Sequence, residues 1–314
     1  MSKSIDTKLI HAGEPNPRVE GAVAMPIFQS AMFEYAGSED EVRYIRYSNN
    51  PNQIVLQEKM AALENAEDAV VTSSGMAAIS SALLSVLCPG DHLLAQNCLY
   101  GGTHNLVTSL LSDLGISFDF IDASSPSMWE SALRPTTKAI YVESITNPLI
   151  EVGELGAVAE FAKSHGLVSM IDNTFASPVN FRPLDWGYDV SIHSATKYLN
   201  GHSDLVAGVA VGSVPLVAGI RRKVTQLGGS LDPHACYLLH RGLKTLAVRV
   251  RRQNDSALRL AQMLESHPAV SRVHYAGLAS SPSHGNATTY LDGYGGMVSF
   301  EIDADDEAVQ NFMR

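Results

Sequence analysis

Short apolar runs alternate with longer helical patterns between about residues 50 and 215. The runs are continuously apolar, which is typical of strands that are buried on both faces of a mostly parallel sheet. Several intervening segments begin at a proline or end at a glycine, as helices do. The pattern predicts an α/β fold with a mostly parallel, seven-stranded sheet flanked by helices, and its strands are AVVTS, HLLAQN, SFDFID, KAIYVES, LVSMID, DVSIHS and LVAGVAVG.

The two ends of the chain have different patterns. Residues 1–49 contain prolines and no clean period, so we expect an N-terminal arm that is extended and packs on another surface. Residues 50–247 form the predicted large domain. The long helical stretch HACYLLHRGLKTLAVRVRRQNDSALRLAQMLESH leads from it into residues 248–314, a small α+β domain whose one convincing strand lies in YGGMVSFEIDADD. We expect this small domain to be incomplete.

Composition and charge exclude several classes of protein. The 314 residues are 45% hydrophobic and 18% charged, which predicts an ordinary globular protein of roughly two domains. The formal net charge of -11 disfavours nucleic acids and membranes as partners. The three cysteines have no Cys-x-x-Cys spacing, and the first residues lack the apolar core of a signal peptide. We therefore expect a reducing, cytoplasmic location.

Polar residues gather where the predicted strands end. The ends read TSSG at 72–75, ESITN at 143–147, DNT at 172–174 and HSATK at 193–197. Ligands of open α/β sheets bind outside the carboxyl ends of the strands, so these residues are candidates for a binding site. A glycine between a strand and a helix leaves backbone N–H groups free to bind a phosphate.

Each candidate also has a purely structural interpretation. Gly75 alone fits a tight turn, Asp172 alone fits a helix cap, and Lys197 alone fits a surface lysine. Together they favour a cofactor site. A lysine that forms a Schiff base, an acid that pairs with a pyridine nitrogen and a cradle for a phosphate are what pyridoxal phosphate requires.

Two stretches carry a resemblance to a known family. The stretch SIHSATKYLNGHSD, which contains Lys197, is the more characteristic one, and TKLIHAG at 7–13 precedes it in the order that the family has. The sequence resembles the Cys/Met-metabolism, or transsulfuration, family of pyridoxal-phosphate enzymes. Its members include cystathionine γ-lyase, cystathionine γ-synthase, methionine γ-lyase and O-acetylhomoserine sulfhydrylase. The resemblance implies the aspartate-aminotransferase-like fold, pyridoxal 5′-phosphate as the cofactor and a place in cysteine and methionine metabolism.

The resemblance also implies roles for individual residues. Lys197 would form the Schiff base, and Asp172 would keep the pyridine nitrogen protonated. Tyr100 would stack on the ring and exchange protons with the leaving group, and Asn147 would bond near the phenolic oxygen. The phosphate would be bound by the backbone of Gly75 and Met76, by the hydroxyls of Ser194 and Thr196 and, from the arm of a neighbouring subunit, by Tyr44 and Arg46.

Two departures from the family pattern bear on these expectations. The family commonly has one asparagine before a proline and then threonine, whereas this chain reads NNPN at 49–52, which leaves the register of that loop open. The arginine that binds the substrate carboxylate in the family lies in a later part of the second domain, beyond Arg314. The cofactor site is therefore expected to be complete and the substrate site incomplete, as in a fragment.

The expected activity is that of a carbon–sulfur lyase, which cleaves cystathionine or a related sulfur amino acid by elimination. Gly102 favours cystathionine, because methionine γ-lyases tend to carry cysteine there, whereas cystathionine lyases and sulfhydrylases carry glycine. A γ-replacement enzyme (cystathionine γ-synthase or O-acetylhomoserine sulfhydrylase) and a catalytically silent, cofactor-binding fragment are the alternatives. The family further implies a homo-oligomer, a dimer of dimers whose sites are shared between subunits.

Other charged clusters are weaker candidates. His193, His202 and Asp204 do not have the spacing of metal ligands, so we expect no metal and place them in loops near the phosphate. A basic cluster on the C-terminal helical stretch is expected to face solvent or another subunit, and it comprises Arg249, Arg251 and Arg252.

Overall fold

The centre of the molecule is a seven-stranded sheet with the order β1-β7-β6-β5-β4-β2-β3. The computed structural model describes residues 4–35, 37 and 42–314. Strand β7 is antiparallel to β1 and β6, and the other neighbours in the sheet are parallel, which confirms the predicted α/β fold. The strands are β1 (Asp68–Thr72), β2 (His92–Gln96), β3 (Ser117–Ile121), β4 (Thr137–Glu143), β5 (Val168–Asp172), β6 (Val190–Ser194) and β7 (Gly208–Gly212).

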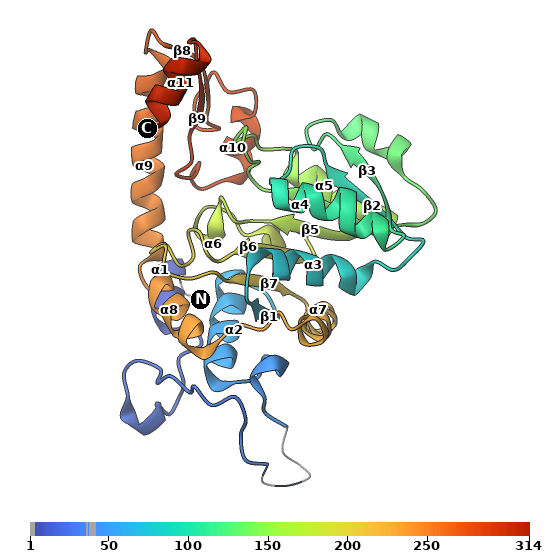
Figure 1. The fold of residues 1–314 in the computed structure, drawn as a ribbon, viewed down its shortest axis with the longest axis vertical. Coiled ribbons are helices and arrows are strands. Elements are labelled where there is room, and N and C mark those ends of the chain that lie inside the picture. Colours follow the sequence, from blue (N-terminus) through green and yellow to red (C-terminus); the bar gives the residue numbers. More distant parts are fainter. Residues whose placement is uncertain (1–3, 36, 38–41) are drawn as a thin grey trace.

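Helices cover both faces of this sheet (Figure 1). Alternate residues of β1 divide between the two faces, because Val70 packs with α3 and α7, whereas Ala69 and Val71 pack with α2 and α8. Among the described residues, no helix is long and apolar enough to cross a membrane. The helices of this part are α2 (Pro51–Leu63), α3 (Gly75–Val86), α4 (Gly101–Asn105) with a π-helical continuation (Leu106–Leu111), α5 (Leu155–His165), α6 (Ser177–Asn180), α7 (Val214–Leu227) and α8 (Pro233–Leu243).

The C-terminal part contains a second, two-stranded sheet. The expectation of one strand in this part is wrong, because β8 (Val270–His274) pairs antiparallel with β9 (Ser299–Ile302). Strand β8 is missed because two of its five residues are exposed and polar. The long helical stretch is also two helices, α8 and α9 (Leu246–Glu265), and α9 leads to this sheet (Figure 1). The remaining helices are α10 (His284–Tyr290) and α11 (Asp306–Met313).

The N-terminal segment is only partly extended. It begins with helix α1 (Ile5–His11), which the expectation of an extended arm misses. Leu9 of this helix is 1% exposed and packs in the core with α2. The guanidinium of Arg251 in α9 donates to both carboxylate oxygens of Asp6, at 2.7 and 2.9 Å. The start of the arm is therefore fastened to its own subunit.

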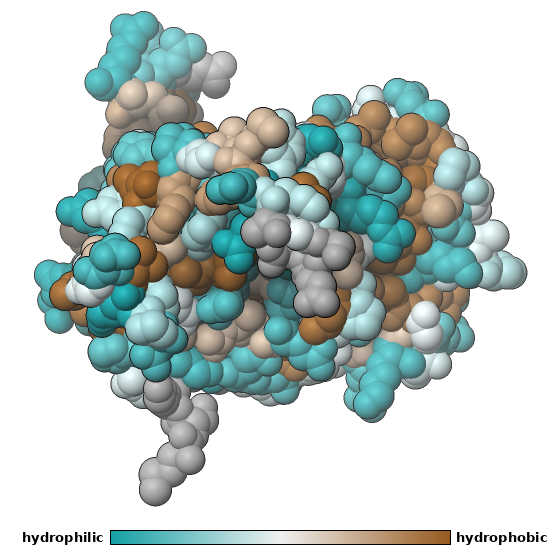
Figure 2. Space-filling view, turned by 90° about the horizontal axis from the view of Figure 1, so that it is seen from below, coloured by the Kyte–Doolittle hydropathy of each residue, from teal (hydrophilic) through white to brown (hydrophobic). Residues whose placement is uncertain are grey.

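The rest of the arm follows the first turn of α2. Asn50 is the N-cap of α2 and its side chain donates to Phe28 O at 2.7 Å, which fixes the register that the NNPN sequence left open. The Asn52 side chain donates to Pro26 O at 2.8 Å. Figure 2 views the molecule from the side on which this arm lies and shows apolar areas beside polar ones. The exposed apolar side chains of the arm include Val23, Ile27, Met32, Tyr35 and Val42.

Candidate active site

Lys197 lies in the turn that follows β6, at the carboxyl edge of the parallel strands. The turn is closed by hydrogen bonds from Lys197 N to Ser194 O at 3.1 Å and from Gly201 N to Lys197 O at 2.8 Å. The Lys197 side chain is exposed, so its amine is accessible. The hydroxyl of Thr196, which the resemblance places on the phosphate, here accepts from Ala207 N at 3.1 Å.

Helix α3 begins directly against the end of β6. A Cβ atom at Gly75 would lie 2.8 Å from the Ser194 Cβ, so this approach requires glycine. Ser74 caps the helix by accepting from Ala77 N at 3.0 Å. Within the described part of the chain, the N–H groups of Gly75 and Met76 have no hydrogen-bond partner. These two free donors at a helix N-terminus fit a phosphate.

Asp172 ends β5 and is buried. Its carboxylate accepts from Thr174 N at 2.9 Å and from the Tyr141 hydroxyl at 3.4 Å. Burial raises the pKa of Asp172, and among the residues that the structure describes no lysine or arginine forms an ion pair with it. A cationic ligand, such as a protonated pyridine nitrogen, would stabilise this carboxylate.

Glu143 is a second buried carboxylate beside Asp172, and the two are partners in the β4–β5 register. Burial, and then the charge of Asp172, raise the pKa of Glu143 to about 8. Tyr100 N donates to Glu143 Oε1 at 2.6 Å, and Asn147 N donates to Oε2 at 3.2 Å. Glu143 thus joins two residues that the resemblance places at the cofactor. In the sequence, Glu143 is distinguished only by its position at the end of a strand, as Asp172 is.

The Tyr100 side chain extends over the start of α4 and is 48% exposed. A Cβ atom at Gly102 would lie 2.6 Å from Tyr100 Cε1 and 3.1 Å from Met76 Sδ. The glycine at 102 therefore lets the tyrosine ring approach the N-terminal turn of α3. This packing gives Gly102 a structural role in addition to the substrate preference that the resemblance attaches to it.

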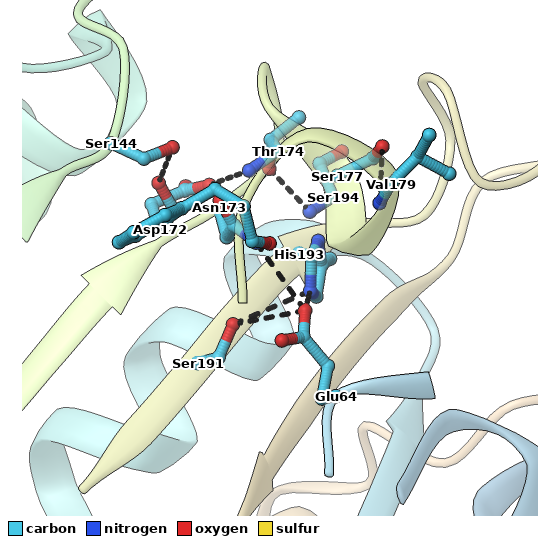
Figure 3. A network of polar contacts seen from close by, with 11 residues as sticks. Glu64, Ser144, Asp172, Asn173, Thr174, Ser177, Val179, Ser191, His193 and Ser194 are labelled. Carbon is cyan, nitrogen blue, oxygen red and sulfur yellow. Dashed lines mark hydrogen bonds and ion pairs between the residues drawn. The ribbon is translucent and has the colours of Figure 1, made fainter. Parts of the chain in front are cut away.

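Thr174 connects Asp172 with the lysine turn, as Figure 3 shows. Its N–H donates to Asp172, and its hydroxyl accepts from Ser194 N at 2.8 Å. One residue therefore fixes the ends of β5 and β6 relative to each other. No motif in the sequence singles out this threonine.

A buried ion pair lies next to this connection. The prediction that His193 belongs to a phosphate loop is wrong, because His193 lies inside β6 and its Nε2 is 2.5 Å from Glu64 Oε1. Both side chains are 0% exposed. Figure 3 shows that the same Glu64 oxygen accepts from Ser191 and Asn173, so this pair supports the ends of β5 and β6.

Arg249 also differs from its expected exposed position. Its guanidinium donates to Tyr198 O at 2.8 Å and to Gly242 O at 2.9 Å. It therefore fastens the residue after Lys197 to the last turn of α8. The other two arginines of the cluster, Arg251 and Arg252, are exposed as expected.

Tyr44 and Arg46 lie on the arm, against α7. Arg46 Nη1 donates to Thr225 O at 3.1 Å, and the guanidinium lies 5.5 and 5.2 Å from the ring centroids of Tyr44 and Tyr47. Within the described residues, the structure does not bring this pair into contact with Lys197 or Gly75 of the same chain.

The residues at the carboxyl edge fit pyridoxal 5′-phosphate. Free N–H groups at Gly75 and Met76 suit the phosphate, the unpaired Asp172 suits the ring nitrogen, and the accessible amine of Lys197 suits the aldehyde. The site therefore offers one group of suitable chemistry for each reactive end of the cofactor.

Comparison with known proteins agrees with this fit. The family model described as Cys/Met metabolism PLP-dependent enzyme matches residues 6–314. A probable cystathionine gamma-synthase of Herpetosiphon aurantiacus is 39% identical over 311 residues, which are 98% of this chain and 97% of that protein. A cystathionine beta-lyase of Lactococcus lactis subsp. cremoris is 40% identical over 313 residues, covering 99% of this chain and 82% of that protein.

A solved structure extends the similarity to the fold. The crystal structure of cystathionine gamma-lyase from Lactobacillus plantarum, complexed with L-serine, matches with a TM-score of 0.92 at 37% identity. The match covers 96% of this chain and 79% of that one. The chain therefore belongs to the Cys/Met metabolism family of PLP-dependent transsulfuration enzymes, has their fold, and uses pyridoxal 5′-phosphate as its cofactor.

Proposed function

We propose that this enzyme is a carbon–sulfur lyase that cleaves cystathionine or a related sulfur amino acid by elimination. One observation carries the proposal: Thr174 ties the turn of the accessible Lys197 to the buried, unpaired Asp172. Relatives named as cystathionine beta-lyase and cystathionine gamma-lyase support the substrate class.

The residues of the site divide the work between binding and proton transfer. Gly75, Met76 and Ser194 hold the phosphate, with Thr196 completing the cradle. The bound cofactor supplies an electron-withdrawing ring that stabilises negative charge on the substrate carbon next to the amino group. Asp172 pairs with the positive charge on the ring nitrogen, and burial strengthens this pairing because water is excluded.

Three side chains act on the substrate side of the cofactor. The Lys197 amine removes the proton from the substrate carbon next to the amino group and, for elimination at the γ carbon, would also take one from the β carbon, so that the β C–H electrons form the double bond that releases the sulfur. The Tyr100 phenol donates a proton to the departing sulfur, so that it leaves as a neutral thiol. The Asn147 side chain orients the ring through its oxygen substituent. The half-exposed position of Tyr100 gives a substrate access to the phenol.

Products of purified holoenzyme with cystathionine test this function. Elimination at the γ carbon yields cysteine, ammonia and 2-oxobutanoate, whereas elimination at the β carbon yields homocysteine, ammonia and pyruvate. We expect 2-oxobutanoate, together with slower or no release of keto acid from methionine. Absence of keto acid from both substrates would contradict the lyase assignment.

A γ-replacement enzyme is the second candidate. The Herpetosiphon relative, 97% of whose length is matched by this chain, is named a probable cystathionine gamma-synthase. The same preparation, given an activated homoserine ester with cysteine or with sulfide, would then form cystathionine or homocysteine without releasing keto acid. Binding of the cofactor without turnover of any of these substrates would favour a catalytically silent protein.

We further propose that the site is shared between subunits of a homo-oligomer, a dimer of dimers. Tyr44 and Arg46 of one arm would reach the phosphate in the neighbouring subunit, which is consistent with the position of Arg46 on α7 of its own chain. Exposed apolar side chains along the arm support an interface there.

We also propose a cytoplasmic location, which the three free cysteines support. The proposed structural units are residues 1–49, 50–247 and 248–314.

Mixing two inactive variants tests the shared site. We expect Arg46→Ala to weaken cofactor binding, because an arginine fork is lost from the phosphate. A mixture of Arg46→Ala with Lys197→Ala subunits would regain activity in about a quarter of the sites, since each hybrid dimer has one site with both native residues. Arg43→Ala, a neighbouring exposed arginine, is the matched control. Hybrid dimers that form without any recovery would contradict the shared site.

A further inference from the structure

Glu143 contacts the backbone of two separate loops that carry site residues. Tyr100 lies in the loop between β2 and α4, and Asn147 in the loop between β4 and α5. Each donates its N–H to a different oxygen of the Glu143 carboxylate, at 2.6 and 3.2 Å. The Glu143 N–H itself donates to Gln96 Oε1 at 2.8 Å, which ties the same point to the end of β2.

We propose that Glu143 is a positioning residue for the reaction, whose carboxylate holds the loops of Tyr100 and Asn147 in place beside Asp172. The inference rests on the proposed function, in which both side chains face the cofactor. Each oxygen of the Glu143 carboxyl group accepts one of the two N–H groups, so a single side chain can restrain both loops. The Tyr100 loop is also held by Asn97 N, which donates to Ile121 O at 2.8 Å, and by a contact of Cys98 Sγ with Asn147 O at 3.9 Å, but no side chain caps the short helix α4 that follows.

Only a carboxylate has the chemistry that this position needs. Glu143 offers two acceptor oxygens to two N–H donors, whereas glutamine would turn an NH₂ group towards one of them. Glu143 is 4% exposed, so a donor that lost its acceptor would have little access to water. Burial and the neighbouring Asp172 both disfavour its charge, and the two N–H groups act in the opposite direction on its pKa.

Hydrogen exchange of the holoenzyme measures the proposed restraint directly. We compare wild type with Glu143→Gln and follow peptides that cover residues 98–104 and 144–150 by mass spectrometry. We expect exchange in at least one of the two peptides to accelerate about tenfold, because glutamine keeps one acceptor oxygen and one lost hydrogen bond weakens local protection by roughly that factor. The circular dichroism of the bound cofactor should change, and kcat should fall about tenfold or more with a smaller change in KM.

Two further variants separate positioning from general destabilisation. Glu151→Gln makes the same chemical change in the second loop, where Glu151 uses its backbone to pair with Thr146, and we expect wild-type exchange and dichroism. Glu143→Asp keeps the carboxyl group but is one methylene shorter, so it should loosen at least one loop even if the glutamine variant does not fold.

Wild-type exchange in both loops of a folded Glu143 variant would overturn the proposal. A lower melting temperature with unchanged loop exchange and dichroism would overturn it too, since that result describes a merely structural residue. Exchange and dichroism need no substrate. A wild-type enzyme without lyase activity would therefore contradict the proposed function and leave the test of Glu143 intact.

Discussion

Replacing Lys197 by alanine is expected to remove the visible absorption of lysine-bound cofactor and to lower the rate of keto-acid release by a factor on the order of 10² to 10⁴, the usual contribution of a positioned base. The reason is chemical, because the amine of Lys197 is an accessible nucleophile at the carboxyl edge, where the free N–H groups of Gly75 and Met76 suit a phosphate. Alanine has no group that can bond to the cofactor aldehyde. Absorbance and steady-state rates of purified protein provide both measurements.

The control for this variant is Lys163→Ala, which removes an exposed lysine from the last turn of α5. We expect wild-type absorption and turnover from it. Because the Lys197 side chain is exposed and is not part of the core, its loss should leave the melting temperature of the cofactor-free protein nearly unchanged. Lysine-bound absorption that persisted in Lys197→Ala would assign the Schiff base to another lysine.

The sheet could be predicted because its strands carry a local signal. The central strands carry short apolar runs because both of their faces are buried, whereas the edge strand β3 is only partly buried. The strand ends could be predicted for the same reason, since a polar residue that follows a buried run lies at the edge of the sheet. Asp172 and Lys197 became candidates in this way. Their specific roles came from the resemblance and not from their positions.

What was missed depends on contacts between residues that are distant in the sequence. Glu64 and His193 are 129 positions apart, and each alone is compatible with an exposed helix end or a loop. Arg249 is 51 positions from its acceptor Tyr198 O, so an arginine on a helix could not be distinguished from a solvated one. Strand β8 was missed because it pairs on the edge of a small sheet, where two of its residues remain exposed. No local period encodes such pairings.

Replacing Asp172 by asparagine is expected to weaken cofactor binding by roughly 10- to 150-fold, which corresponds to about 1.5–3 kcal/mol for a hydrogen bond to a charged group. Asparagine keeps the size of the side chain but cannot balance a positive ring nitrogen. Turnover should fall as well, because the ring withdraws electrons less well when its nitrogen is not protonated. Titration of cofactor-free protein with pyridoxal 5′-phosphate, followed by fluorescence, gives the affinity.

Without cofactor, the Asp172→Asn substitution is expected to have a favourable effect, on the stability of the fold. Burial raises the pKa of Asp172 above its value in the unfolded chain, so its contribution to stability is complete below the unfolded pKa and is lost as the pH rises through the folded one. Asparagine does not ionise, so the variant does not lose this stability as the pH rises. The pKa of Glu143 should also fall in the variant, because the neighbouring charge is gone. We therefore expect the cofactor-free variant to gain stability relative to wild type as the pH rises, although it binds the cofactor less tightly. Denaturant unfolding at several pH values measures this difference. A wild-type advantage that grew with pH would show that Asp172 is already paired with a cationic group of the protein.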